Sequence, residues 1–255
     1  MAGKIFIGTS GWNYAHWSKD QFYPRTCPQR EWLAYYARYF RTVEINNSFY
    51  RLPAPETFTA WSRQVPPDFI FAVKGSRFIT HMKKLKEPKQ SVKLFLSHSS
   101  RLRKKLGPIL FQLPPQMKIN APRLKEFIGA LSRRKRLRIS LEFRHESWFI
   151  DEIYDIIEKA GWAICVADGI GAAQEIPVLG PFCYFRRHGT TARYASCYSD
   201  DQLRRDAERM MDLAEHGRDV YVYFNNDAQA FAIKNAFTLE KFIDPKYLHK
   251  IRTES

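Results

Sequence analysis

Residues 138–148 read RISLEFRHESW, a strand pattern that ends in a group of charged side chains. A strand has a two-residue period, so its side chains alternate between two faces. One face here is apolar and holds Ile139, Leu141 and Phe143. The opposite face carries Glu142 and Arg144. Buried charges are costly unless they are paired, so this strand predicts a polar site inside the fold.

The same kind of strand recurs along the whole chain. Eight strands are predicted, at residues 4–8, 42–46, 69–77, 108–115, 138–143, 162–168, 182–189 and 220–227. Most are followed by a segment with helical periodicity, at 27–40, 56–64, 92–106, 122–134, 153–160, 203–214 and 227–239. No linker or change of composition interrupts this alternation. The pattern is typical of a parallel α/β barrel.

The predicted fold is therefore one TIM-like (β/α)8 barrel domain over residues 1–255. The competing architecture is an open, doubly wound sheet, which commonly carries a G-x-G-x-x-G turn after its first strand. Here the first strand is followed by GTSGW, at residues 8–12, which lacks that spacing. The barrel is the favoured prediction.

The composition predicts a soluble, cytoplasmic protein without a membrane partner. The chain has 255 residues, of which 45% are hydrophobic, enough for a large core. Its first residues hold too short an apolar run for a signal peptide, and no apolar segment is long enough to span a bilayer. The four cysteines form no C-x-x-C pair. We expect them to be reduced and partly buried rather than disulfide-bonded or zinc-bound.

Positive charge is concentrated in one part of the chain. The formal net charge is +15, and residues 89–145 alone hold fifteen Lys and Arg against two acidic residues. This segment therefore contributes +13, and the remainder of the chain contributes +2. Such asymmetry indicates a polyanionic or anionic partner.

Polar side chains gather where the predicted strands end. In barrels of this type the catalytic residues lie at the carboxyl ends of the strands. Strand parity places Glu44, Lys74 and Glu142 inside, with Asp168 as a fourth interior group. The predicted catalytic residues are thus Glu44, Lys74, Glu142 and Asp168. The predicted substrate- or anion-binding residues are Asn46, Arg77, Gln112, Arg144, Arg186, Arg187, His188, Asn225 and Asn226.

Aromatic residues near the strand ends form a further predicted group. Trp12, Tyr14, Tyr50 and Trp148 could close a ligand site as an aromatic lid, by stacking on a base or a sugar ring. Loops over a barrel also need apolar cover, which explains these rings equally well. An ion-pair network with a purely structural role is the corresponding alternative for the polar residues.

Several long motifs resemble the YecE-like family, a widespread bacterial domain of unknown function. They are GTSGWNYAHW (8–17), VEINNSFYRLP (43–53), FAVKGSRFITH (71–81), ILFQLPP (109–115), LEFRHESW (141–148), RRHG (186–189) and VYFNND (222–227). The resemblance covers nearly the whole chain. It implies a TIM-barrel fold with distant similarity to sugar isomerases and apurinic endonucleases. The family has no settled activity, so the resemblance assigns no catalytic residue.

The favoured functional hypothesis is an enzyme, of isomerase, lyase or hydrolase type, acting on an anionic or phosphorylated substrate. Barrels frequently bind phosphate after strands seven and eight. Arg186, Arg187 and His188 follow the seventh strand, and the amides at Asn225 and Asn226 are expected to open the last helix. Cationic side chains and a helix N-terminus together suit a phosphate of a sugar phosphate or nucleotide.

Two further hypotheses remain open. A divalent metal could bind Glu44, Glu142 and Asp168 together with His81, His145 or His188, as in a metal-dependent sugar isomerase. Nearby cations and the absence of an H-x-H motif count against a metal, and no metal ligand is assigned. Alternatively, the basic clusters 101–105 and 133–138 could bind nucleic acid, with or without endonuclease activity. They are expected on the face opposite the strand ends.

Overall fold

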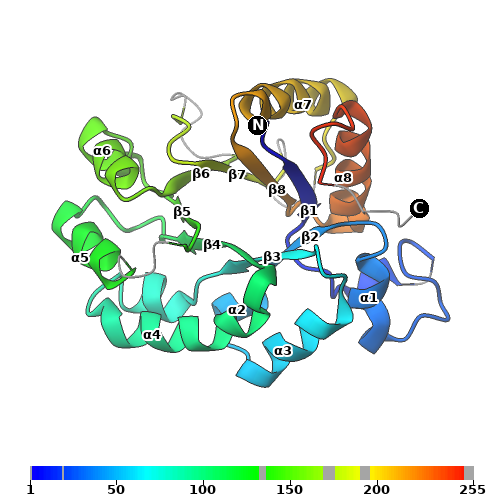
Figure 1. Cartoon of the computed structure of the whole chain (residues 1–255), viewed down its shortest axis with the longest axis horizontal. Coiled ribbons are helices and arrows are strands. Elements are labelled where there is room, and N and C mark those ends of the chain that lie inside the picture. The colour runs from blue at the N-terminus through cyan, green and yellow to red at the C-terminus, as the bar shows by residue number, and fades with distance from the viewer. Residues whose placement is uncertain (1, 19, 132–135, 169–175, 190–195, 250–255) are drawn as a thin grey trace.

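A computed structural model describes residues 2–18, 20–131, 136–168, 176–189 and 196–249. Eight parallel strands form one sheet, in the order β1-β8-β7-β6-β5-β4-β3-β2. The strands are β1 Ile5–Thr9, β2 Thr42–Ile45, β3 Ile70–Lys74, β4 Leu106–Gln112, β5 Ile139–Glu142, β6 Ala163–Ala167, β7 Phe182–Arg187 and β8 Asp219–Phe224. Figure 1 shows this ring of strands surrounded by helices. The prediction of a TIM-like barrel is confirmed.

The α-helices form the outer ring of the barrel (Figure 1). They are α1 Trp32–Tyr36, α2 Asn47–Tyr50, α3 Pro55–Gln64, α4 Pro88–Ser99, α5 Ala121–Leu131, α6 Asp151–Lys159, α7 Asp200–Glu215 and α8 Phe231–Phe242. Short 3-10 or π turns lie between them: η1 Ala15–Trp17, η2 Gln29–Glu31, η3 Phe78–Met82, η4 Ser100–Lys105, η5 Glu146–Trp148 and η6 Ala228–Ala230. Each long helix packs an apolar stripe against the strands.

The core has two layers, because the strands are buried on both faces. The outer layer joins the strands to the helices and holds residues such as Val43, Phe111 and Leu141. The inner layer fills the barrel with Phe6, Ile70, Ala72, Leu110, Ala163, Cys165, Ala167, Phe182, Tyr184, Tyr221 and Tyr223. Most of this layer lies towards the amino ends of the strands, so the polar side chains at the carboxyl ends pack on apolar residues.

The barrel is nearly closed between β1 and β2. Within the described chain, these strands share one isolated bridge, between Ser10 and Glu44. Gly8 permits the close approach, because a Cβ there would lie 2.3 Å from the Thr42 carbonyl oxygen. Further down, the segment 247–249 takes the place of a partner strand. Ile5 N donates to Tyr247 O at 2.8 Å, and His249 N donates to Ile5 O at 3.0 Å.

Three predicted helices differ in detail from the observed ones. The helix expected over 27–40 is reduced to η2 and α1, since its aromatic residues are weak helix formers. Ser199, not Asp200 or Asp201, is the N-cap of α7 and forms a capping box with Gln202. The last helix begins at Phe231 rather than at Asp227. Asn225 and Asn226 therefore do not open that helix.

Candidate functional site

The centre of the upper barrel is an ion-paired group of Glu44, Glu142 and Arg186, from β2, β5 and β7. Arg186 donates to Glu44 from Nε at 3.1 Å and from Nη2 at 2.9 Å. Its Nη1 donates to Glu142 Oε2 at 2.9 Å. All three side chains are at most 1% exposed. One guanidinium thus joins both carboxylates, which satisfies the expectation that Glu44 and Glu142 meet at one mouth.

Glu44 is held as a fully bonded carboxylate. Besides Arg186, it accepts hydrogen bonds from Ser10 Oγ at 2.6 Å and from the Tyr184 hydroxyl at 2.7 Å. Burial alone would raise the pKa of Glu44, but the Arg186 charge, Lys74 and these hydrogen bonds hold it below its ordinary value. Burial raises the pKa of Tyr184, so that its hydroxyl remains a donor. Glu44 is therefore an ionised acceptor.

Glu142 links this centre to Arg144 and His188. Its Oε1 contacts Arg144 Nη2, and Arg144 Nη2 lies 2.9 Å from His188 Nε2. Burial would raise the pKa of Glu142, but Arg186 and Arg144 lower it below its ordinary value. The Nε of Arg144 is buried and donates to none of the residues described.

His188 is a neutral acceptor towards two guanidiniums. Its Nε2 faces Arg144 at 2.9 Å and Arg186 at 3.3 Å. Burial and these two charges push the pKa of His188 far below its ordinary value. The other ring nitrogen, Nδ1, lies 3.1 Å from the amide nitrogen Nδ2 of Asn225. His188 therefore has the properties of a positioning residue rather than an acid or base.

Lys74 ends β3 and differs from its charged neighbours. Its side chain is 8% exposed, and Nζ lies 4.3 Å from the centroid of the Phe49 ring. Across the ranges described above, no hydrogen bond or ion pair involves Nζ. Burial, with the Arg186 charge, lowers the pKa of Lys74 to about 8, although Glu142 and Glu44 oppose the shift. Lys74 is thus a buried amine that titrates near neutral pH.

Asp168 and Arg187 lie on the outer side of the strands, contrary to the prediction for Asp168. Ala167 belongs to the inner layer, so the next residue turns outwards. Arg187 donates to Asp206 of α7 at 2.6 and 2.5 Å and to Asp168 at 3.2 Å. The Asp168 carboxylate also accepts from Tyr198 and from His188 N. These residues fasten α7 to β7 and do not face the barrel interior.

Two other predicted residues, Asn226 and Trp148, have structural contacts. Asn226 Nδ2 donates to Ser196 O at 2.9 Å and to Asn235 Oδ1 at 2.8 Å, which anchors α8. Trp148 is fully buried, stacks on Phe143 with 4.8 Å between ring centroids, and donates to Met117 O. It lies in the outer core, so it is no part of a lid.

The remaining predicted residues lie around the mouth. Gln112 is the register partner of Glu142, and Arg77 is exposed just beyond β3. Asn46 lies just beyond β2 as the N-cap of α2 and lines a side cavity together with Trp12, Tyr14 and Tyr50. The structure also adds Ser10 and Tyr184 to the site. Tyr184 and Arg186 are two residues apart on β7, so their side chains lie on the same face of the strand. Strand parity alone could therefore have identified Tyr184.

The carboxylates are already engaged by cations, which bears on the metal hypothesis. Across the described ranges, no group of three or more His, Cys, Asp or Glu residues has an arrangement that could hold a metal ion. His145 lies apart and accepts from Ser147 N at 3.1 Å. The donor set around Glu44 and Glu142, with guanidiniums on both, does not fit a divalent cation.

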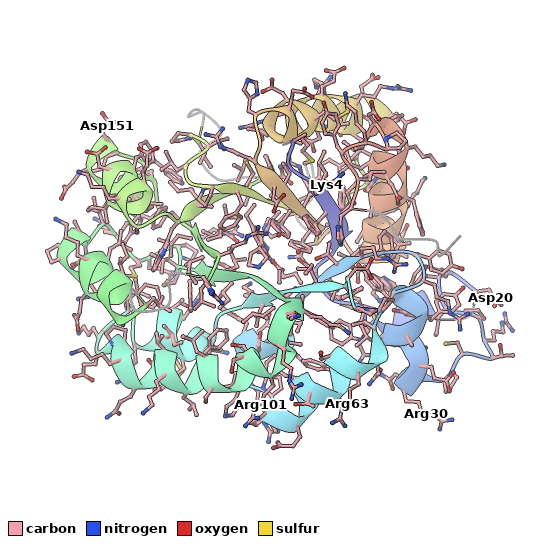
Figure 2. The ribbon with its side chains drawn as sticks, viewed as in Figure 1. Lys4, Asp20, Arg30, Arg63, Arg101 and Asp151 are labelled. Carbon is pink, nitrogen blue, oxygen red and sulfur yellow. The ribbon has the colours of Figure 1, made fainter. Side chains whose placement is uncertain are left out.

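The basic cluster at 101–105 lies on the face opposite the mouth, as expected. It forms η4, which leads into the amino end of β4, and Figure 2 shows Arg101 at the outer edge of the molecule. Lys105 Nζ donates to Ser62 O at 2.5 Å and Val65 O at 2.7 Å, at the carboxyl end of α3. Arg133, Arg134 and Lys135 lie outside the described residues. Nucleic-acid binding stays a prediction.

No helix in the described part of the chain is both long and apolar enough to span a membrane.

Comparison with known proteins places the chain among uncharacterised barrels. A crystal structure of a DUF72 family protein from Thermotoga maritima superposes with a TM-score of 0.81 and 29% identity, covering 93% of this chain and 98% of that one. A second DUF72 family structure, from Enterococcus faecalis, gives a TM-score of 0.77 at 22% identity, over 94% of this chain and 95% of the other.

Curated relatives agree with these structures. The UPF0759 protein YunF of Bacillus subtilis is 25% identical over 95% of this chain and 96% of its own length. The UPF0759 protein YecE of Escherichia coli is 30% identical over 57% of this chain and 50% of its own length. The family model described as "Protein of unknown function DUF72" matches residues 6–254. The chain therefore belongs to the DUF72 family, of which YecE and YunF are relatives.

Proposed function

We propose that this protein is an enzyme that acts at the carboxyl mouth of the barrel on a small anionic carbonyl compound, with Lys74 as the reacting group. The observation that carries the proposal is the buried Lys74 amine. It has no hydrogen-bond or ion-pair partner among the residues described, and its pKa is lowered to about 8. Strongly perturbed groups of this kind cluster at functional sites.

The lowered pKa makes Lys74 a nucleophile at physiological pH. A drop from 10.5 to about 8 increases the neutral amine at pH 7 roughly 300-fold. The Nζ lone pair would attack the carbonyl carbon, and the resulting carbinolamine would lose water to give an iminium. Hydrolysis at the end of the cycle returns the amine. No oxidant or reductant is needed.

The fixed charges around Lys74 support an anionic substrate. The carboxylates Glu44 and Glu142 are balanced by the guanidiniums of Arg186 and Arg144. A protonated Lys74, or the iminium formed from it, therefore adds one uncompensated positive charge. The buried Arg144 Nε, which donates to none of the described residues, supplies a hydrogen-bond donor beside it. A substrate carboxylate or phosphate would complement both.

This proposal changes the predicted phosphate site. That site required Arg186 and a helix N-terminus at Asn225 and Asn226. Arg186 has all its nitrogens engaged and is 1% exposed, and α8 begins at Phe231. The anion is therefore assigned to Lys74 and Arg144, and a phosphate between β7 and β8 is not retained.

The direct test is reductive trapping of the iminium. The protein would be incubated with 2-oxo acids or with aldose and ketose phosphates in the presence of cyanoborohydride, then analysed by peptide mass spectrometry. We expect a covalent adduct on Lys74 for anionic carbonyl compounds and a much weaker one for their neutral analogues. Lys74→Met should abolish it, whereas Lys105→Met, which alters a half-buried lysine elsewhere, should not. Adducts spread evenly over surface lysines would overturn the proposal.

A further inference from the structure

A cavity of about 510 Å3 opens beside the mouth, between the loop after β1, η2, α2 and α3. Its volume lies within the range of small-ligand sites. Of the twelve described residues that line it, five are Asn or Gln and four are Trp or Tyr. The chemistry of this lining differs from that of the charged barrel centre. It is built from carboxamides and aromatic rings.

The cavity has almost no net charge of its own. Among the described residues that line it, Arg30 is the one with a charge. Its side chain is 83% exposed and lies 3.6 Å from the Glu31 carboxylate, and Figure 2 shows it at the periphery. Solvent and Glu31 therefore screen it. The moiety that suits this cavity is uncharged.

The carboxamides suit a ligand with many hydroxyl groups. Each Asn or Gln side chain carries both donors and an acceptor, and a hydroxyl group likewise donates and accepts. Gln29 Nε2 already donates to Asn13 Oδ1 at 2.7 Å, and the other carboxamide groups remain for a ligand. The Oδ1 of Asn46 is buried and accepts no hydrogen bond from the residues described. An unpaired buried acceptor is costly, so a ligand hydroxyl at this position would be stabilising.

The aromatic rings favour a puckered ligand over a flat one. The rings of Trp12 and Trp61 meet at 89° with 5.2 Å between centroids. Tyr50 is 71% exposed at the rim and meets Phe49 at 90°. Neither contact forms a parallel slot of the kind that sandwiches a nucleobase. Angled rings instead offer faces to the C–H groups of a sugar ring.

The cavity adjoins the reacting group through two elements. Asn46 directly follows β2, two residues beyond Glu44, and lines the cavity. Tyr50 belongs to α2, whose Phe49 ring lies under Lys74 Nζ. We propose that this cavity is a carbohydrate subsite, holding the uncharged sugar ring of the substrate while its anionic carbonyl end reaches Lys74. The assignment of the sugar to a substrate rests on the proposed function, but carbohydrate binding does not.

Binding can be measured with neutral saccharides alone. Saturation-transfer NMR would be recorded with a panel of unmodified mono- and disaccharides, and with adenosine and guanosine as flat comparison ligands. We expect saturable signals from at least one saccharide and none above background from the nucleosides. Tyr50→Ala should weaken the binding about tenfold, the loss of roughly one ring contact. Tyr39→Ala, which alters another exposed tyrosine outside the cavity, is the matched control.

A second pair of variants separates this inference from the proposed enzyme. Gln64→Ala, an exposed lining residue, should weaken saccharide binding without affecting folding. Lys74→Met should bind the saccharide unchanged, because Lys74 does not line the cavity. If Lys74→Met binds the saccharide but the parent protein gives no trapped adduct on Lys74, the proposed reaction is wrong and the carbohydrate subsite still stands. Nucleoside binding stronger than saccharide binding, absence of any saccharide signal, or equal effects of Tyr50→Ala and Tyr39→Ala would overturn the subsite.

Discussion

Arg186 and Glu44 meet through two hydrogen bonds, from Nε and Nη2 to the two carboxylate oxygens, at 3.1 and 2.9 Å. Both side chains are at most 1% exposed. The third nitrogen of the same guanidinium holds Glu142. Two carboxylates from β2 and β5 thus depend on one cation from β7, which ties opposite walls of the barrel together.

Removal of Arg186 should be strongly destabilising. Arg186→Met would leave Glu44 without its cation and Glu142 with only Arg144. We expect a loss of about 3–5 kcal/mol in the free energy of unfolding, measured by urea denaturation at pH 7. The combined variant with Glu44→Gln and Glu142→Gln should recover much of the loss, because its carboxamides need no counter-charge. A single-variant loss below about 1 kcal/mol, the scale of an exposed pair, would contradict this account.

Lys74→Met should stabilise the protein, and the gain should depend on pH. Below pH 8 Lys74 is protonated in both the native and unfolded states, so burial of its charge costs the full penalty. Between pH 8 and 10.5 the native state loses this proton first, so the wild type gains stability as pH rises. The expected advantage of the variant is up to about 3 kcal/mol at pH 7.

Thermal or urea unfolding of both proteins from pH 7 to 10.5 would show the effect. The advantage of Lys74→Met should shrink steadily over this window. An advantage that stays constant or grows with pH would mean that Lys74 is not a buried, destabilised cation.

Asp227 should be replaceable by Asn but not by Ala. Its Oδ1 accepts from the indole Nε1 of Trp17 at 2.7 Å, and Trp17 is fully buried. Asp227→Ala leaves that donor unpaired, with an expected loss of about 1–3 kcal/mol. Asp227→Asn keeps an acceptor and should lose clearly less. Equal losses in chemical denaturation would show that the indole bond contributes little.

Lys105 and Lys104 are adjacent in sequence but should differ in effect. Lys105 Nζ donates to two carbonyls at the end of α3, whereas Lys104 is exposed. Lys105→Met should cost about 1–2 kcal/mol in unfolding free energy, and Lys104→Met should be neutral. If this face binds nucleic acid, Lys104→Glu should instead weaken that binding and flatten its dependence on salt. Comparable losses of stability in both Met variants would count against the capping role of Lys105.

The sequence was sufficient to predict the barrel and the meeting of Glu44, Lys74, Glu142 and Arg144. Hydrophobic periodicity sets the number of strands, and parity selects their inward residues. Asp168 was misplaced because both faces of β6 are apolar, so parity could not select the inward one; the inward residues are Ala163, Cys165 and Ala167, and Asp168 pairs with outward Arg187. The role of Arg186 as the ion-pair partner of Glu44 and Glu142 was not predicted. Its carboxylate partners lie 142 and 44 residues away, beyond any local pattern.

Other differences arose from tertiary packing. Trp148 was predicted to cover the site, but stacking on Phe143 draws it into the outer core. The start of α8 was placed at Asp227, which has a good capping side chain; its carboxylate instead bonds Trp17. Trp17 lies 210 residues from Asp227 in the sequence, and local sequence rules contain no information about such a partner.

The incomplete pairing between β1 and β2 has a consequence for synthesis on the ribosome. β1 pairs with β8, and Ile5 also pairs with residues 247–249. The first strand therefore cannot form these pairs until the last strand has been synthesised. At typical elongation rates the 210 residues between Thr9 and Asp219 take roughly 10–40 s to emerge. Throughout that interval the nascent sheet has two unpaired edges. We therefore expect this chain to depend on chaperones while it is being translated. A circular permutant with its new termini between β1 and β2 should depend on them less.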